Sequence, residues 1–523
     1  MLSPKYLWLL AGLLLMPALL IHLGLMTLIG DEGIRADVAL EMLLSGNYLV
    51  PTINGEPYLN KPPLYNWILT GAFTLLGRAD EWAARLPTVF FLLTYAGVCV
   101  WYLRKHVPAV QAWLVAAMIV TCGRILFWDS LLGLIDICFS LVVFANFLWI
   151  FHWSEHERWG RMFVGSWLIT VVAFMLKGLP ALVFQVLTIA GWLAWLGWER
   201  HRQVGRAARW ALVRGLAWPN WVGMALAFGL LGTYYYLYAQ QAPLEPLLER
   251  LFTESAKRTA VQYGMGKTIL HLFTFPFEMA YHFFPWSLMV LLVFARGAFR
   301  QIWQHRLLTF FAVTFAANIW VYWSSVEVYP RYLLMFLPLV FLPFVHWYLQ
   351  LPLRQSPFGK WVNGLFVAFA LLATVGALAP LFLQDRLAQV PALVPKSVLL
   401  FALAGWMLLH IWRQAPARQL PAMVVLLLVV RLGFDWFVLP DRLREDWGTL
   451  VRSTTIETAE MARAEGQCLW LYKGTWIPAT NSFYLSAHTG QIIRRTLQPS
   501  PGEWMIVDTT LYRVPLQVKS TFK

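Results

Sequence analysis

The chain has 523 residues, of which 59% are hydrophobic, 16% are aromatic and only 13% are charged, and its mean hydropathy is +0.58. This composition excludes an ordinary soluble protein and predicts a polytopic membrane protein. The net charge of +14 could suggest nucleic-acid binding. Because most arginines lie in short segments between apolar runs, we interpret them as orientation signals and contacts with membrane lipids, and expect no nucleic-acid partner.

Apolar runs predict about thirteen transmembrane helices. The first run, Leu7 to Ile29, is too long for a signal peptide and lacks a small-residue cleavage site, so we expect a retained helix. No disulfide framework follows from the spacing of the four cysteines. The expected spans are 7–29, 86–103, 110–128, 134–152, 162–177, 180–198, 217–239, 280–295, 307–324, 332–349, 361–383, 397–412 and 420–439.

Clusters of arginine and lysine fall on one side of the membrane if these spans alternate. The positive-inside rule makes that side cytoplasmic, together with the N-terminus, and makes the opposite side external. Five polar segments fall on the external face, as does everything after Pro440: the loop 31–85, the corner Asp129–Asp136, the turn Lys177–Gly178, the loop 240–279 and the turn Val326–Arg331. The loop 240–279 would fit a lid over a site.

The first external loop, 31–85, predicts two helices along the membrane surface. From Ala36 to Leu44 apolar residues recur at helical spacing, while Asp37 and Glu41 occupy the other face, and Ser45-Gly46-Asn47 should end this helix. Asn54-Gly55 predicts a turn. The apolar stretch Leu64 to Leu76 is short for a span and should also lie along the membrane.

The character of the sequence changes after the transmembrane domain, 1–439. Residues 440–523 predict a small external α/β domain, with a helix over Thr454–Ala464 and a short helix over Asn481–Ser486. Alternating segments predict strands at Cys468–Tyr472 and Trp504–Val507.

Acidic residues at the external membrane edge are the first candidates for chemistry. Asp31 and Glu32 directly follow the first apolar run, and Asp136 begins a later one, with Asp129 earlier in the same corner. Each has a structural alternative, as a solvated helix-end carboxylate or a group that stabilises the helix dipole. Carboxylates from different helices at one cavity would suit removal of a proton from a hydroxyl, or binding of a cation that neutralises phosphate.

Cations on the same face are candidates for binding phosphate. Lys61 precedes Pro62-Pro63, Lys177 lies in Lys-Gly-Leu-Pro, and Arg331 lies in Tyr-Pro-Arg-Tyr. A rigid backbone beside a cation is a reasonable way to hold phosphate, although a membrane-edge cation is more often a snorkelling anchor. The further candidates are Arg35 and Arg85, with Tyr329 and Tyr332 as supporting residues or members of the aromatic belt.

At these residues the chain resembles the polyprenyl-phosphate-dependent glycosyltransferases related to aminoarabinose transferase and protein O-mannosyltransferase, which belong to the GT-C superfamily. The similarity is carried by the run DEGIRADVALEMLLSGNYLVPTINGEPYLNKPPLYNWILTGAFTLLGRADEWAARLPTV. Shorter agreements extend it over essentially the whole chain: Asp136, Lys177-Gly178, Phe284-Pro285-Trp286, Tyr329 to Leu334 and Asn481 to Leu485.

The resemblance implies a GT-C fold and an inverting transfer of a sugar from a polyprenyl (undecaprenyl) monophosphate to an external acceptor. It also implies a bacterial inner-membrane protein whose active site and C-terminal domain lie on the periplasmic face. It implies that Asp31 is the catalytic carboxylate, supported by Glu32, and that Asp136 is a second acidic participant. It also implies donor-phosphate binding by Lys61, with help from the other cations, Arg35, Lys177 and Arg331.

The chain departs from the aminoarabinose branch at two positions that the family associates with a metal site. Asn60 stands where the branch has a glutamate, and the family histidine aligns with Lys267-Thr268, with His271 displaced. A divalent metal therefore stays open as a cofactor, but we expect cations such as Lys267 to replace it.

Four functions are considered. A glycosyltransferase acting on a glycolipid such as lipid A, or on another envelope glycan, is the leading hypothesis, and a protein O-glycosyltransferase differs from it only in the acceptor. A secondary transporter would also have about a dozen spans, but it usually shows internal repeats and broken helices at the membrane midplane. A non-catalytic scaffold would leave the acids of the first loop unexplained.

Overall fold

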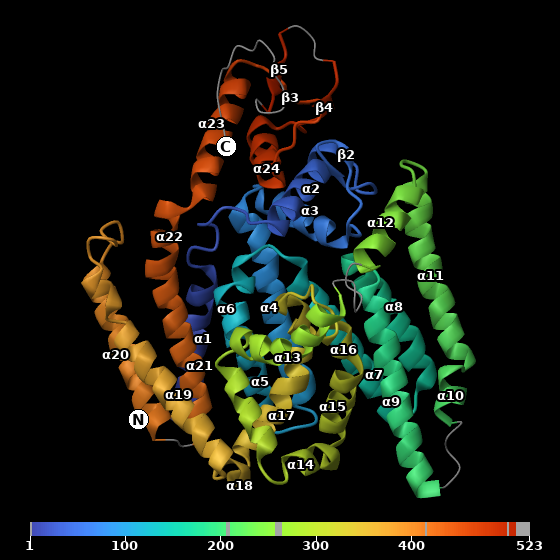
Figure 1. The fold of residues 1–523 in the computed structure, drawn as a ribbon, viewed down its shortest axis with the longest axis vertical. Helices are drawn as coiled ribbons and strands as arrows, with labels where there is room; N and C mark the ends of the chain where they lie inside the picture. The colour runs from blue at the N-terminus through green and yellow to red at the C-terminus, as the bar shows by residue number, and fades with distance from the viewer. Residues whose placement is uncertain (1–2, 205–209, 257–263, 414–415, 499–501, 509–523) are drawn as a thin grey trace.

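The fold is a long bundle of apolar helices whose upper end is covered by smaller elements (Figure 1). The computed structural model describes residues 3–204, 210–256, 264–413, 416–498 and 502–508. Within these ranges ten helices are long and apolar enough to cross a membrane. They are α4 (Glu81–Leu103), α7 (Ile135–Glu155), α8 (Trp159–Lys177), α9 (Pro180–Val204), α11 (Trp218–Ala239), α20 (Leu393–Trp412) and the runs Arg306–Trp323, Pro330–Leu349, Pro357–Phe382 and Arg418–Glu445.

The four runs each combine shorter helices. Their members are α15 (Arg306–Asn318) and α16 (Trp320–Trp323); the 3-10 helix η3 (Pro330–Phe336) and α17 (Leu337–Leu349); α19 (Pro357–Gly376) and η4 (Ala379–Phe382); and α21 (Pro416–Gly433), the π-helix η5 (Phe434–Val438) and α22 (Leu439–Glu445). The short connecting helices are α10 (Trp210–Gly215), α14 (Ala298–Gln304) and α18 (Leu351–Arg354).

The expected count of about thirteen spans is not confirmed. A helix pair bent by 43°, α5 (Ala109–Thr121) followed by Gly123–Leu131, would raise the number in the described residues to eleven. Helix α1 (Pro4–Leu20) has 17 residues and is shorter than the expected span. The stretch 280–295 is divided between the end of α13 (Met265–His282) and the 3-10 helix η2 (Trp286–Phe294), so it is not one long helix. The bent segment contains α6 (Gly123–Phe127) and η1 (Asp129–Leu131).

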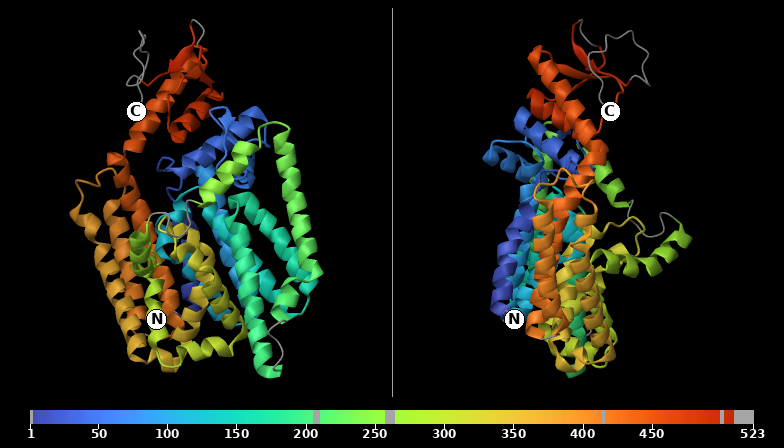
Figure 2. Two further views of the ribbon diagram at one scale, coloured as in Figure 1. Left: turned by 45° about the vertical axis from the view of Figure 1, so that its right-hand side comes forward. Right: turned by 90° about the vertical axis from the view of Figure 1, so that its left-hand side faces the viewer.

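The first external loop folds as expected in its elements. Helix α2 (Asp31–Ser45) ends at Gly46, whose φ of 69° suits glycine. Asn54 and Gly55 turn the chain between β1 (Thr52–Ile53) and β2 (Glu56–Pro57), which pair antiparallel. Helix α3 (Leu64–Leu76) follows. These elements lie at one end of the bundle, beside the C-terminal elements, in both views of Figure 2.

The expectation that Asp37 and Glu41 form a polar outer face of this helix is wrong, because both side chains are fully buried. Helix α24 (Ala479–Thr489) packs on α2 so closely that a Cβ at Gly33 would clash with the Thr480 hydroxyl. The Glu41 carboxylate accepts hydrogen bonds from Thr52 and from the backbone of the Asn54-Gly55 turn. Burial and the nearby Glu41 raise the pKa of Asp37 well above its ordinary value, and burial raises the pKa of Glu41.

The elements after Pro440 include helices and strands near the expected positions, together with a strand, β4, that was not expected. Helix α23 (Trp447–Ala464) begins earlier than expected, since the Asp446 side chain caps it. The strands β3 (Leu469–Tyr472), β4 (Arg495–Thr496) and β5 (Trp504–Ile506) form a parallel sheet in the order β4-β3-β5. A separate small core joins them to the helices: Ala459, Ala462, Leu469, Leu471, Ile477, Leu485, Ile493 and Ile506.

The loop 240–279 is not an open loop in its described part. It contains α12 (Glu245–Ala256) and most of α13. Helix α12 lies against the upper end of the bundle, whereas α13, yellow-green, projects from its side in the right-hand view of Figure 2. The described part of the loop therefore consists mainly of two helices, of which only α12 lies near the covered end.

Candidate functional site

Four of the residues singled out in the sequence converge at the covered end of the bundle. Asp31 is the first residue of α2, Asp136 lies in the first turn of α7, and Lys177 is the last residue of α8. Arg331, near the start of η3, donates from Nη2 to Oδ2 of Asp31 at 2.8 Å, and its Nε lies 3.4 Å from Oδ2 of Asp136. The Lys177 ammonium pairs with the other oxygen of Asp136. Two acids and two cations from four helices therefore form one neutral network.

The two acids of this network differ in accessibility. The side chain of Asp31 is 54% exposed, whereas that of Asp136 is 6% exposed. Only Asp31 is open enough to reach a hydroxyl group that approaches from outside. Asp136 instead holds Lys177 and Arg331 together, because each of its oxygens faces one of the two cations.

Tyr329 and Tyr332 cover the two cations. The Lys177 ammonium lies 4.0 Å from the ring centroid of Tyr332, and the guanidinium carbon of Arg331 lies 4.7 Å from that of Tyr329. The two rings meet edge to face at 5.6 Å. Ring faces attract cations and limit their motion, so the tyrosines support the network.

Glu32 and Arg85 lie inside the protein, away from this network's open side. The side chains are 0% and 1% exposed, and Arg85 donates to both carboxylate oxygens of Glu32, at 2.7 and 2.9 Å. Glu32 also accepts from the backbone N–H of Gly133 and Ile29. Arg85 donates further to the carbonyls of the segment between α1 and α2: Leu23, Met26 and Thr27. This pair fixes the backbone on both sides of Asp31 and has the geometry of a scaffold.

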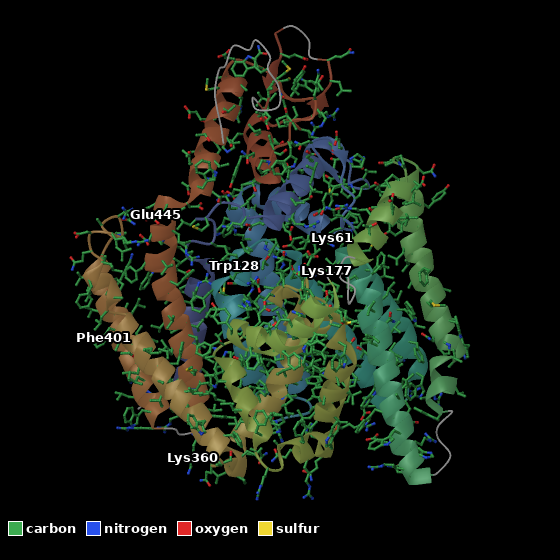
Figure 3. All side chains as sticks on the ribbon, in the orientation of Figure 1. Lys61, Trp128, Lys177, Lys360, Phe401 and Glu445 are labelled. Atoms are coloured by element: carbon green, nitrogen blue, oxygen red, sulfur yellow. The ribbon has the colours of Figure 1, made fainter. Side chains whose placement is uncertain are left out.

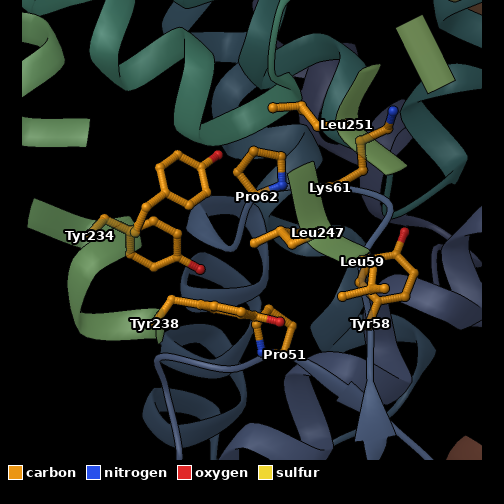
Figure 4. Close-up of a pocket in the computed structure, with 10 residues that line it drawn as sticks. Pro51, Tyr58, Leu59, Lys61, Pro62, Tyr234, Tyr238, Leu247 and Leu251 are labelled. Atoms are coloured by element: carbon orange, nitrogen blue, oxygen red, sulfur yellow. The ribbon is translucent and has the colours of Figure 1, made fainter. Parts of the chain in front are cut away.

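Lys61 lies in a narrow crevice beside α11 and α12 (Figure 4). The crevice is mostly apolar and aromatic, and Lys61 is the cationic residue in its lining. Arg35 does not line the crevice but donates a hydrogen bond of 2.8 Å to the hydroxyl of Tyr58, one of the lining residues. The lining residues are Pro51, Tyr58, Leu59, Lys61, Pro62, Tyr234, Tyr235, Tyr238, Leu247 and Leu251.

The crevice adjoins the ion-pair network through α12. Leu251 lines the crevice, and a Cβ at Gly178, the residue after Lys177, would lie 3.0 Å from its Cδ1. Gly178 has a φ of 81°, so a side chain there would be strained as well. Figure 3 labels both Lys61 and Lys177 in the upper part of the helix bundle, below the C-terminal elements. The site therefore extends from Lys61 to Asp31 along one end of the bundle.

Arg250 belongs to the site but was not singled out in the sequence. Its Nε donates to Oδ1 of Asn60 at 2.6 Å. The signal was present as helical spacing, since Leu247, Arg250 and Leu251 share one face of α12. That spacing alone does not reveal which part of the chain the face contacts.

Two candidates lie outside the network. Asp129 pairs with Arg124 at 3.1 Å, and the charges of Asp136 and Arg331 act on it without forming an ion pair with it. Lys267 is exposed in the first turn of α13, and Asn60 is contacted by Arg250 instead. The cation that contacts Asn60 is therefore Arg250, and not Lys267 as expected.

The residues around Asn60 do not fit a metal site. Across the ranges that the structure describes, no group of three histidine, cysteine, aspartate or glutamate side chains lies close enough to hold a metal ion. The oxygen of Asn60 already accepts from Arg250, and a guanidinium has no lone pair to offer a metal. Asn60 and Arg250 are therefore suited to a hydrogen bond with each other and not to binding a metal ion.

Comparison with known proteins begins with sequence relatives; no family model matches the chain. It is 27% identical over 213 residues to the undecaprenyl phosphate-alpha-4-amino-4-deoxy-L-arabinose arabinosyl transferase of Shewanella sediminis, and 26% identical over 167 residues to that of Edwardsiella ictaluri. The matches cover 38% and 31% of this chain but only 37% and 30% of those relatives.

Solved structures match over a greater length. The crystal structure of ArnT from Cupriavidus metallidurans bound to undecaprenyl phosphate aligns with a TM-score of 0.62 at 17% identity, covering 95% of this chain and 87% of that one. Its apo structure aligns with a TM-score of 0.60 and covers 94% and 86%. At this identity the likeness establishes a shared fold.

Proposed function

We propose that this multi-pass membrane protein, which has the GT-C fold of the ArnT structures, transfers a sugar from a polyprenyl monophosphate to an acceptor on the periplasmic face of a bacterial inner membrane. The observation that carries the proposal is the junction of an exposed carboxylate, Asp31, with paired cations at one end of the bundle. The names of the sequence relatives and the undecaprenyl phosphate bound to one solved structure support the same donor class.

In the proposed reaction the acceptor hydroxyl attacks the anomeric carbon of the sugar while Asp31 takes its proton. The bond between that carbon and the phosphate oxygen breaks, and its electron pair leaves with the polyprenyl phosphate. Lys61, Lys177 and Arg331 would balance the charge of this leaving group. Attack opposite the leaving group inverts the anomeric centre. Because phosphate is already a good leaving group, positioning and proton removal carry most of the catalysis.

The proposed acceptor is a glycolipid such as lipid A or another envelope glycan. Mass spectrometry of lipid, glycan and protein fractions from wild-type and deletion strains tests both donor class and acceptor. We expect the deletion to remove one sugar increment from the glycolipid fraction and to be restored by the wild-type gene. Loss from proteins alone would favour the protein O-glycosyltransferase instead, and unchanged fractions would contradict the proposal.

Replacing Lys61 should weaken use of the donor more than replacing Lys177. Lys61→Ala removes positive charge from the crevice and should raise the donor KM by about tenfold, as expected for a hydrogen bond to a charged group. The Lys177 side chain is 3% exposed beside Asp136 and is less accessible to a donor than Lys61, so Lys177→Ala should affect the donor KM less. Steady-state kinetics of both purified variants measure the difference. Equal and negligible effects would make both lysines membrane anchors.

A further inference from the structure

Helix α12 connects the two lysines of the site. On one side Arg250 donates to the side chain of Asn60, the residue before Lys61. On the other side Leu251 lies against Gly178, the residue after Lys177. Adjacent residues of one helix therefore hold the chain segments that present the two cations.

The segment around Lys61 depends on such a contact for its direction. Pro62 and Pro63 fix their own φ angles, and Pro62 also restricts the backbone of Lys61. The restriction makes the segment stiff but does not orient it relative to the bundle. Helix α12 contacts the segment at Asn60, through the hydrogen bond from Arg250. The two residues are 190 positions apart in the sequence.

The chemistry of arginine suits this role. A guanidinium stays protonated at any physiological pH, and its planar nitrogens donate in fixed directions. The side chains of Arg250, on α12, and of Asn60, in the first external loop, are both partly buried. The contact therefore adds a permanent positive charge beside Lys61 and fixes the turn without a metal ion.

We propose that Arg250 is a positioning residue that acts through Asn60 to aim Lys61 at the donor phosphate, in place of a metal at this position. The proposal rests on the proposed function and deepens it. It predicts that the hydrogen bond between Arg250 and Asn60 serves donor binding, while the chemical step depends on the Asp31 network.

A double-mutant cycle with Arg250→Ala, Asn60→Ala and the double variant tests the proposal in the purified full-length protein. We expect each single change to raise the donor KM about tenfold, with kcat altered less than about twofold. The double variant should match Arg250→Ala, since Asn60→Ala removes only the contact that Arg250→Ala has already removed. Arg250→Lys should recover part of the loss. Glu249→Ala, an exposed neighbour on α12, is the matched control and should behave as wild type.

Additive effects in the double variant would overturn the proposal, as would a donor KM for Arg250→Ala equal to that of Glu249→Ala. Should Arg250→Ala fail to fold, Asn60→Ala and Arg250→Lys still decide the outcome. A chelator supplies a second readout: wild-type activity should persist in EDTA, and strong inhibition reversed by a divalent metal would contradict the replacement of metal by Arg250. If wild type uses no polyprenyl-phosphate donor at all, the proposed function itself fails.

Discussion

Asp31→Asn should reduce the rate of sugar transfer by about a hundredfold to ten-thousandfold, the usual contribution of a positioned general base. The substitution keeps the size of the side chain and an oxygen that can accept from Arg331 Nη2, 2.8 Å away in the native protein. It removes the carboxylate that would take the proton of the acceptor hydroxyl. The loss should therefore appear in kcat, with little change in the donor KM.

Single-turnover assays with purified variants separate these two quantities, and transfer to the acceptor fraction can be followed by mass spectrometry. Because Asp31 is 54% exposed, its replacement should leave the melting temperature close to that of wild type. Glu56→Gln provides a control, since this exposed carboxylate of the same loop pairs with Arg495 and not with a member of the network. A variant with Asp31→Asn that fully retains transfer would remove Asp31 from the catalytic role.

Glu32→Ala should destabilise the protein by about 3–5 kcal/mol, because it leaves the guanidinium of Arg85 buried without its counter-charge. The same change removes the hydrogen-bond acceptor of two backbone N–H groups, those of Ile29 and Gly133. The loss should be seen as a lower melting temperature in detergent and a lower yield of folded protein. The adjacent acids Asp31 and Glu32 are thus expected to fail in different ways.

A surface ion pair from the same loop supplies the comparison. Glu56 lies 3.2 Å from Arg495, and the two side chains are 63% and 26% exposed. Glu56→Ala should cost less than about 1 kcal/mol, since solvent screens an exposed pair. If Glu32→Ala instead kept wild-type stability and lost only activity, Glu32 would belong to the reacting groups and its scaffold role would be wrong.

Several features of the site could be predicted from local sequence. The acid pair after an apolar run, the helix ending at Gly46 and the turn at Asn54-Gly55 depend on residues close in the chain. The placement of Lys61, Lys177 and Arg331 on the same side of the membrane could also be predicted, because it follows from the alternation of the apolar spans. The burial of Asp37 and Glu41 was predicted wrongly, because it depends on a contact between distant parts of the chain. Helix α24, from the far end of the chain, packs on α2.

The sequence by itself determined that this is a membrane protein with acids and cations gathered at one end, because hydropathy and charge spacing act over a single helix or turn. Only the tertiary structure decided the partners. Asp31 meets Arg331 across 300 residues, and Glu32 meets Arg85 across 53. An ion pair forms wherever packing brings opposite charges together, so no local rule could assign exposed Asp31 to the site and its buried neighbour to the scaffold.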